Sequence, residues 1–201
     1  WRTWEEISDE SIVGCFFSNE LVDAFPVHRI ESQAGQLQEV YVATSESDPT
    51  QFVEVVSSPS TPELQSYLDE LGVDLTAYEA GYRSEINLAA LSWLNIVAQK
   101  LCQGYALTID YGYTTAQYYS PQRPQGTLQC YYQQAHHADP YWAIGHQDLT
   151  AHVNFTALES HGQQCKLDTL GFTQQGLFLM ALGLGDRLNA NTNSKNLDLM
   201  D

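Results

Sequence analysis

The chain has 201 residues, which is enough for one domain with a sizeable hydrophobic core. Its 8 Lys and Arg stand against 25 Asp and Glu, so the net charge is −17. This balance excludes a nucleic-acid binder that works by neutralising phosphates, and it argues against binding to an anionic membrane surface. No apolar stretch approaches the roughly 18 residues needed to span a bilayer. The expected partner is a positively charged small molecule or a basic protein segment.

The first expected element is an apolar strand over residues 11–17. Its β-branched and aromatic composition is typical of a strand that is buried on both faces. The polar residues that follow it, 18–26, predict the strand-to-helix junction at which α/β proteins bind ligands.

An antiparallel meander is expected over residues 27–57, inserted after the first strand. Its strands, separated by turn residues, are predicted over residues 27–30, 37–43 and 51–56. A helical insertion is expected over residues 61–83. There Thr61 caps a helix that has Pro62 at its first position and runs to about residue 71.

The clearest helical pattern covers residues 84–103, where apolar side chains recur at three- and four-residue spacing. Ser84 is the predicted cap, and Gly104 is predicted to end the helix. A second buried strand is predicted over residues 105–109. A helix, a glycine and a buried strand together indicate the second half of a parallel crossover unit.

The remaining third of the chain is less periodic. Residues 114–144 are aromatic and contain three prolines, so we expect a long ordered loop. Helices are predicted over residues 155–161 and 173–182, and residues 189–201 are expected to be a polar, disordered tail. The four cysteines are far apart in the sequence, which is typical of small core residues in a reducing compartment.

Polar side chains follow both predicted buried strands. Asn19, Glu20 and Asp23 follow the first, and Asp110 follows the second, together with Tyr111 and Tyr113 around a glycine. Carboxylates at such a crevice can hold a cation, and a glycine lets a ligand approach the backbone closely. The alternative is that the acids cap a helix and the tyrosines pack in a tight turn.

Two further patterns leave alternatives open. Glu85 lies at the predicted start of the 84–103 helix, where an acid complements the helix dipole whether or not it has a function. The histidines at 136, 137, 146, 152 and 161 could form a metal site, but their spacings match no known site, so we expect no metal. The sequence contains no phosphate-binding loop, no serine nucleophile elbow and no Gly-x-Gly-x-x-Gly motif.

Five segments of the chain, in order, resemble the MidA-like methyltransferases. The family patterns are sNE-lDA-Pv, gyrsEi, lliDYGy, GTL-aY and qDiTaHVdF. The matching segments are residues 16–28, 81–86, 107–113, 126–131 and 147–155. Five ordered matches are far more specific than any single motif.

The resemblance implies an α/β fold, with a partial Rossmann-like methyltransferase sheet, the inserted antiparallel β meander and a helical substrate subdomain. It implies S-adenosylmethionine as the cofactor and methylation of a nitrogen, in a basic or arginine-bearing protein. The mitochondrial complex I assembly factor that methylates a protein arginine is similar to this family.

The resemblance also implies roles for particular residues. The expected catalytic residues are Glu20, Glu85 and Asp110, and the last two would hold the substrate guanidinium. The expected cofactor-binding residues are Asn19, Glu20 and Asp23. The expected substrate-binding residues are Tyr111, Tyr113, Asp148 and His152.

The chain departs from the family in three places. The family's glycine-rich cofactor turn precedes the Asn-Glu segment, and this sequence starts just before that segment. Residues 1–201 are therefore expected to be an incomplete, C-terminal portion of a methyltransferase domain that binds the cofactor weakly or not at all alone. Gln134 stands near the family's usual His, and His146 stands where an acid is more common.

A second function remains open. An acidic, aromatic-rich domain with an added meander could instead grip a basic partner without chemistry, as a binding or assembly module. The cysteines and the absence of a leader sequence favour the cytoplasm, and loss of a transit peptide from a fragment would point to mitochondria.

Overall fold

The computed structural model describes residues 1–189, which belong to two compact units. The first unit is Trp1–Leu167 and the second begins at Asp168. The second unit contains α5 (Gln175–Ala181), at the position of the predicted helix 173–182. Of the expected tail 189–201, all but the first residue lies outside the described residues.

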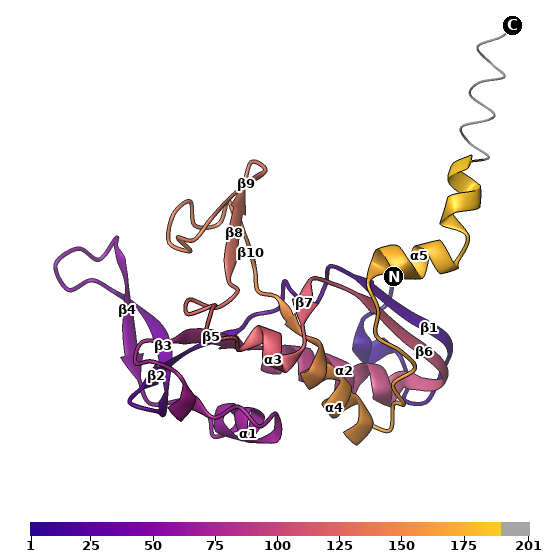
Figure 1. The fold of residues 1–201 in the computed structure, drawn as a ribbon, viewed down its shortest axis with the longest axis horizontal. Coiled ribbons are helices and arrows are strands. Elements are labelled where there is room, and N and C mark those ends of the chain that lie inside the picture. Colours follow the sequence, from indigo (N-terminus) through magenta and orange to yellow (C-terminus); the bar gives the residue numbers. More distant parts are fainter. Residues whose placement is uncertain (190–201) are drawn as a thin grey trace, which may run out of the picture. The chain divides into compact units, whose positions relative to one another are not determined.

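The first unit contains a parallel pair of strands, β1 (Ile12–Asn19) and β6 (Leu101–Ile109), shown in Figure 1. The chain between them includes α2 (Leu88–Lys100), as the crossover pattern predicts. The pair forms a two-stranded sheet, and Val13 and Phe17 are 72% and 63% exposed. The expectation of buried strands is therefore wrong for β1 and for the first part of β6, where Tyr105 is 61% exposed, because no other strand within residues 1–189 joins this sheet.

The start of α2 differs from the prediction. Residues 83–86 form strand β5 (Arg83–Ile86), which pairs with β2 (His28–Gln33), so Ser84 is not a helix cap and Glu85 is not in a helix. Asn87 caps α2 instead, because its side chain accepts a hydrogen bond from the Ala90 backbone at 2.9 Å. The predicted helix end is also wrong, since Gly104 lies within β6.

A four-stranded antiparallel sheet, in the order β4-β3-β2-β5, carries the second part of the unit (Figure 1). Its strands β2, β3 (Gln36–Thr44) and β4 (Phe52–Ser57) lie where the meander strands are predicted. Helix α1 (Glu63–Glu70) follows Thr61 and Pro62 and contributes to the core of the sheet. The buried residues of this core include Ile30, Leu37, Leu64, Leu68 and Ile86.

The first unit also contains several short elements. They are the 3₁₀ helices η1 (Trp4–Glu6) and η2 (Leu75–Ala77), helices α3 (Thr115–Tyr118) and α4 (Phe155–Gln164), and the parallel pair β7 (Gly112–Tyr113) and β11 (Val153–Asn154). Helix α4 covers the predicted helix 155–161 and extends it.

The expected long loop contains a small antiparallel sheet. Strands β8 (Gln129–Tyr132), β9 (Ala135–His137) and β10 (Asp148–Thr150) pair in the order β10-β8-β9. We call residues 129–150 the arm, because they project from the rest of the first unit in Figure 1. Each of these strands has four residues or fewer, so periodicity does not reveal them.

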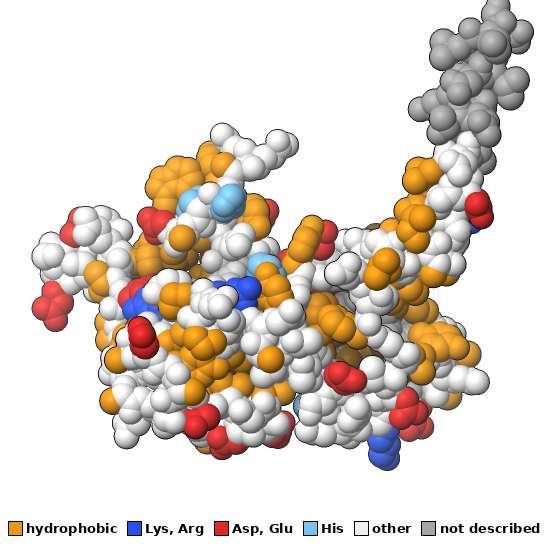
Figure 2. Space-filling model, in the orientation of Figure 1, with side chains coloured by type: hydrophobic (Ala, Val, Ile, Leu, Met, Phe, Trp, Pro, Cys, Tyr) orange, Lys and Arg blue, Asp and Glu red, His pale blue; other side chains and the backbone are white. Residues whose placement is uncertain are grey.

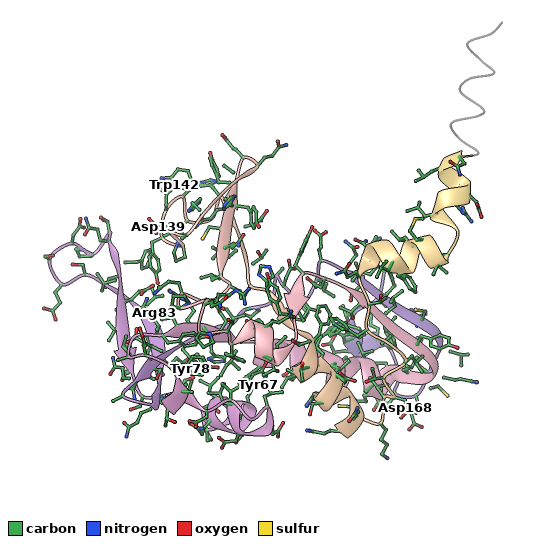
Figure 3. The ribbon with its side chains drawn as sticks, viewed as in Figure 1. Tyr67, Tyr78, Arg83, Asp139, Trp142 and Asp168 are labelled. Carbon is green, nitrogen blue, oxygen red and sulfur yellow. The ribbon has the colours of Figure 1, made fainter. Side chains whose placement is uncertain are left out.

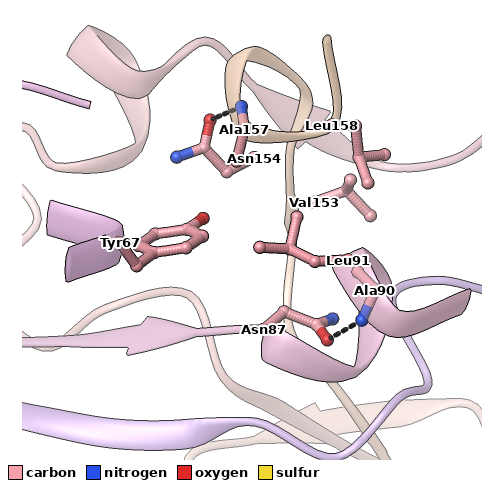
Figure 4. Close-up of a pocket in the computed structure, with 8 residues that line it drawn as sticks. All are labelled: Tyr67, Asn87, Ala90, Leu91, Val153, Asn154, Ala157 and Leu158. Atoms are coloured by element: carbon pink, nitrogen blue, oxygen red, sulfur yellow. Dashed lines mark hydrogen bonds between the residues drawn. The ribbon is translucent and has the colours of Figure 1, made fainter. Parts of the chain in front are cut away.

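A small cavity separates α1, α2 and α4, and Figure 4 shows its lining. The lining residues are Tyr67, Asn87, Ala90, Leu91, Val153, Asn154, Ala157 and Leu158. Asn154 caps α4 by accepting a hydrogen bond from the Ala157 backbone at 3.3 Å, just as Asn87 caps α2. The cavity has a volume of about 10 Å³, which suits one water molecule rather than a ligand.

No helix among residues 1–189 is long and apolar enough to cross a bilayer.

The four cysteines are free, but only Cys130 is buried, while Cys15 and Cys102 are exposed on β1 and β6. The expectation of core cysteines is therefore wrong for those two, because they belong to the open two-stranded sheet.

The buried carboxylate of Glu39 predicts acid-sensitive stability. Burial raises the pKa of Glu39. Hydrogen bonds with His28, Ser60 and Tyr41 outweigh this effect and lower the pKa to about 2. An acid with a lowered pKa stabilises the fold above its unfolded pKa, and this stabilisation disappears as the pH falls toward 2. We expect Glu39→Gln to lower the free energy of unfolding by on the order of 2 kcal/mol at pH 7.

Urea unfolding at pH 7, 5 and 3 measures this effect. The difference between wild type and Glu39→Gln should change little between pH 7 and pH 5 and should shrink between pH 5 and pH 3. The matched control is Glu46→Gln, because Glu46 is exposed in the turn between β3 and β4. A difference that stays constant from pH 7 to pH 3 would contradict the role given to Glu39.

Candidate functional site

A pocket of about 400 Å³ lies where β1 and β6 end and the arm begins. We call it the acidic pocket. Carboxylates, tyrosines, small polar residues and one histidine line it: Glu20, Asp23, Tyr111, Gln129, Tyr131, Asp148, Thr150, Ala151 and His152. Ligands of open α/β sheets bind at the carboxyl ends of parallel strands, so the pocket has the position expected of a binding site.

The turn after β1 is built around Asp110. One carboxylate oxygen accepts hydrogen bonds from the backbone N–H groups of Val22 and Asp23, at 2.9 and 3.4 Å. The other accepts from the Tyr111 N–H at 2.9 Å. The Glu20 N–H donates to the Ile109 carbonyl at 2.8 Å, and Glu20 itself has a φ of 47°. The two polar groups predicted after the two strands are therefore brought together, and Asp110 shapes the turn that carries the others.

The carboxyl group of Asp23 is buried beside other acids. Burial raises the pKa of Asp23, and the nearby charges of Asp110 and Glu20 raise it further. Within residues 1–189, none of the three pocket carboxylates of Glu20, Asp23 and Asp148 forms an ion pair. Such uncompensated negative charge favours a cationic ligand.

One face of the arm forms the opposite wall. Tyr131 of β8 pairs with Asp148 of β10, and Gln129 pairs with Thr150, so these four side chains share a face. Tyr131 and Tyr111 are 41% and 61% exposed. Aromatic rings next to carboxylates attract a cation by cation–π and charge interactions together.

The arm is anchored on the four-stranded sheet through Tyr141. Its hydroxyl donates to Glu54 Oε1 at 3.1 Å, and its ring lies 6.2 Å from that of Phe52. Glu54 in turn pairs with Arg29 and Arg83. Figure 3 shows Asp139 and Trp142 in the arm, away from Arg83 in the sheet. These contacts give the arm a defined place in the first unit.

His152 is held between the arm and β7. Its backbone N–H donates to Thr127 Oγ1 at 3.1 Å, and its ring stacks on Tyr113 at 5.0 Å. Burial lowers the pKa of His152, a hydrogen bond with the Thr127 backbone raises it, the charge of Arg123 lowers it, and that of Asp110 raises it. The net direction is down, which favours a neutral imidazole.

Glu85 lies behind the acidic pocket rather than in its lining. It is 1% exposed and accepts hydrogen bonds from Thr127 N at 2.8 Å, Thr127 Oγ1 at 2.9 Å and Leu128 N at 3.2 Å. Burial raises the pKa of Glu85, while the bonds from Thr127 and Leu128 lower it. A Cβ at Gly126 would lie 2.2 Å from Glu85 Oε1, which explains a glycine there.

The predicted site residues therefore divide into two groups. Glu20, Asp23, Tyr111, Asp148 and His152 line the acidic pocket. Asn19, Glu85, Asp110 and Tyr113 are outside its lining. Sequence reasoning assigned no role to Gln129 and Tyr131, because a strand of four residues is too short to give a periodic signal. Figure 2 shows acidic side chains at many points of the surface and histidine side chains on the arm.

Comparison with known proteins identifies the family. A model of S-adenosyl-L-methionine-dependent methyltransferases matches residues 1–173, and the chain belongs to that family. A Burkholderia thailandensis protein crystallised with S-adenosyl-homocysteine is 33% identical, with a TM-score of 0.82 over 94% of this chain and 47% of its own. A native crystal structure from the same organism is 35% identical, with a TM-score of 0.82 over 90% of this chain and 46% of its own. The α/β methyltransferase fold and S-adenosylmethionine as the family's cofactor follow from these matches.

A curated relative adds a more distant match. The Drosophila melanogaster protein named "Protein arginine methyltransferase NDUFAF7 homolog, mitochondrial" is 28% identical over 171 residues, which are 82% of this chain and 36% of that protein. The chain thus spans about half the length of the solved structures and about a third of this relative.

Proposed function

We propose that the protein transfers a methyl group from S-adenosylmethionine to a nitrogen of an arginine side chain in a protein substrate. The observation that carries this proposal is the acidic pocket at the ends of β1 and β6, whose carboxylates have no cationic partner within residues 1–189. Membership of the methyltransferase family supports the reaction. The name of the fly relative supports arginine, and so does the chemistry of the pocket.

The pocket residues fit the positively charged part of the cofactor. S-adenosylmethionine supplies a methyl group on a positively charged sulfur, and the uncompensated carboxylates of Glu20 and Asp23 suit that charge. We propose that Glu20 and Asp23, with Asn19 at the end of β1, hold this part of the cofactor. Asp110 keeps them in place through its bonds to the 22–23 backbone.

The other wall of the pocket suits a guanidinium. Asp148 can accept paired, charge-assisted hydrogen bonds, and the rings of Tyr111 and Tyr131 offer faces to a cation. Glu85 and Tyr113 act from behind this wall, through Thr127 and His152. Glu20, Glu85 and Asp110 thus contribute to catalysis by holding and aligning the reactants, which is the main source of rate in methyl transfer between bound groups.

We propose a basic protein partner located in the cytoplasm, and a mitochondrial location, which the fly relative's name carries, is the alternative. From the family resemblance we also propose a part in complex I assembly.

The decisive experiment uses the protein expressed from its full coding sequence. Purified protein is incubated with S-adenosylmethionine carrying a tritiated methyl group and with lysate from cells that lack the gene. Acid hydrolysis and amino-acid analysis then show which residue carries the label. Label in methylarginine is the expected result. Label in another amino acid would overturn arginine as the target, and no label would overturn methyl transfer.

The pocket carboxylates predict weaker cation binding when they are neutralised. We expect Asp148→Asn to weaken binding of a blocked Gly-Gly-Arg-Gly-Gly peptide by about tenfold, since it removes a charge-assisted hydrogen bond worth about 1.5 kcal/mol. Calorimetry with the same peptide carrying citrulline, which is neutral, is the control. Equal affinity for the arginine and citrulline peptides would contradict a guanidinium site. Arginine binding without methyl transfer would favour a non-catalytic binding module.

A further inference from the structure

We propose that His152 accepts the proton that the substrate nitrogen gives up when it is methylated. This inference rests on the proposed function and names a role within it that goes beyond binding. His152 is the histidine of the pocket lining, and it stands in the same lining as Glu20, Asp23 and Asp148.

His152 lies between β10 and β11, in a segment that is hydrogen-bonded to the residues after β1 and β6. The Ala151 N–H donates to the Asp23 carbonyl at 2.9 Å, and the Val153 N–H donates to the Tyr111 carbonyl at 2.7 Å. The His152 N–H itself donates to Thr127 Oγ1. Three successive backbone groups are therefore held in place, which fixes the backbone of His152 relative to the pocket.

Glu85 contributes to the position of His152 through Thr127. Its carboxylate accepts from both the N–H and the hydroxyl of Thr127, so the Thr127 oxygen is held ready to accept the His152 N–H. Glu85 is thus a positioning residue that acts through Thr127. The stacked ring of Tyr113, which Arg123 contacts at 4.2 Å from its centroid, restricts the imidazole plane.

The lowered pKa of His152 favours a neutral ring, which has one nitrogen free to accept a proton. A neutral imidazole that donates through one nitrogen has its lone pair on the other. That second nitrogen is the acceptor we assign.

Charged groups around the His152 ring shift its pKa in opposite directions. Arg123 of the segment before β8 disfavours the imidazolium, while Asp110 after β6 favours it. The carboxylates of Glu20, Asp23 and Asp148 line the same pocket and attract the cationic product of proton uptake. Carboxylates are much weaker bases than imidazole, which makes His152 the better proton acceptor near neutral pH.

Methyl transfer and proton transfer together account for every bond and charge. The substrate nitrogen forms one N–C bond to the methyl carbon, and the methyl–sulfur bond breaks with its electron pair remaining on sulfur. The nitrogen loses one N–H bond, and the proton forms a new N–H bond on His152. The guanidinium keeps its single positive charge, and the imidazolium later returns its proton to water.

The test compares the wild-type protein, expressed from its full coding sequence, with His152→Asn and His152→Gln. We expect a loss of about 100-fold in kcat, little change in KM for an arginine peptide, and loss of the acid limb of the rate profile. The matched control is His146→Asn, because His146 is exposed in the arm outside the pocket lining and should leave the rate unchanged.

A second readout does not depend on turnover. NMR titration of the His152 ring should give a pKa below the ordinary histidine value, and saturation with the blocked Gly-Gly-Arg-Gly-Gly peptide should lower it by ~0.5 unit or more. The citrulline peptide should leave it unchanged. An unshifted His152 pKa with the arginine peptide bound would overturn the inference even if the variants failed to fold.

The outcomes separate the two proposals. A wild-type protein that methylates no arginine overturns the proposed function and this inference with it. An active wild type whose His152 variants keep both kcat and the acid limb overturns this inference alone. Loss of kcat with rescue by added imidazole in His152→Ala supports a proton acceptor, which a purely structural role would not produce.

Discussion

Replacing Glu85 by Ala should lower the free energy of unfolding by at least about 3 kcal/mol. Glu85 is 1% exposed, and its two oxygens satisfy three donors from Thr127 and Leu128. Each buried donor left without a partner costs about 1–3 kcal/mol, and the deleted side chain also leaves a cavity. Urea unfolding followed by circular dichroism measures the loss.

Two further variants separate the causes. Glu85→Gln keeps the volume and one acceptor oxygen, so it should recover part of the lost stability. Gly126→Ala should also destabilise the packing around the Glu85 carboxylate. Gly126 has a φ of 77°, and a Cβ there would lie 2.2 Å from Glu85 Oε1. If Glu85→Ala unfolds within about 1 kcal/mol of wild type, the 126–128 segment does not depend on this carboxylate.

The pocket's location was predictable because two strand ends are local features of the sequence. Asn19, Glu20 and Asp23 follow one apolar strand and Asp110 follows another, and parallel strands joined by a crossover end at the same edge. Their hydrogen bonds to one another confirm the proximity. Which of them face a ligand and which support the turn depends on side-chain direction, and residue spacing does not contain that information.

The arm could not be predicted for a different reason. Its strands pair over four residues or fewer, and Tyr141 reaches Glu54 across 87 positions of the sequence. Contacts at that separation depend on the rest of the fold rather than on local propensity. Four of the nine lining residues, which are Gln129, Tyr131, Thr150 and Ala151, are therefore absent from the predicted site.

Glu85 shows how tertiary pairing overrides a helical pattern. Ile86 fits the apolar stripe of the following helix, and Ser84 and Glu85 are predicted at its start, yet all three belong to a strand that pairs with β2. Asn87 then supplies a better cap than Ser84, and the helix begins after it. A helix-terminal acid in the sequence thus becomes a buried carboxylate in the structure.

The conformation of Gly104 leads to the second large effect. The sequence suggests a residue that ends a helix, but the structure places Gly104 opposite Gly14 in the β1–β6 pair, with a φ of 140°. A Cβ there would lie 1.7 Å from the Gly14 carbonyl oxygen and 2.8 Å from its carbon. Backbone atoms cannot rotate away as a side chain can, so the two strands would have to separate.

We therefore expect Gly104→Ala to lower the free energy of unfolding by about 4 kcal/mol or more, and to abolish binding of the arginine peptide. Binding should be lost because the bonds from Glu20 N to Ile109 and from Val22 N to Asp110 follow directly from this strand pairing. The control is Gln103→Ala on the same strand. The Gln103 side chain is exposed, so its loss should change the free energy of unfolding by less than about 0.5 kcal/mol. A Gly104→Ala protein that melts near the wild-type temperature and binds the peptide normally would show that the pocket does not need the close approach of β1 and β6.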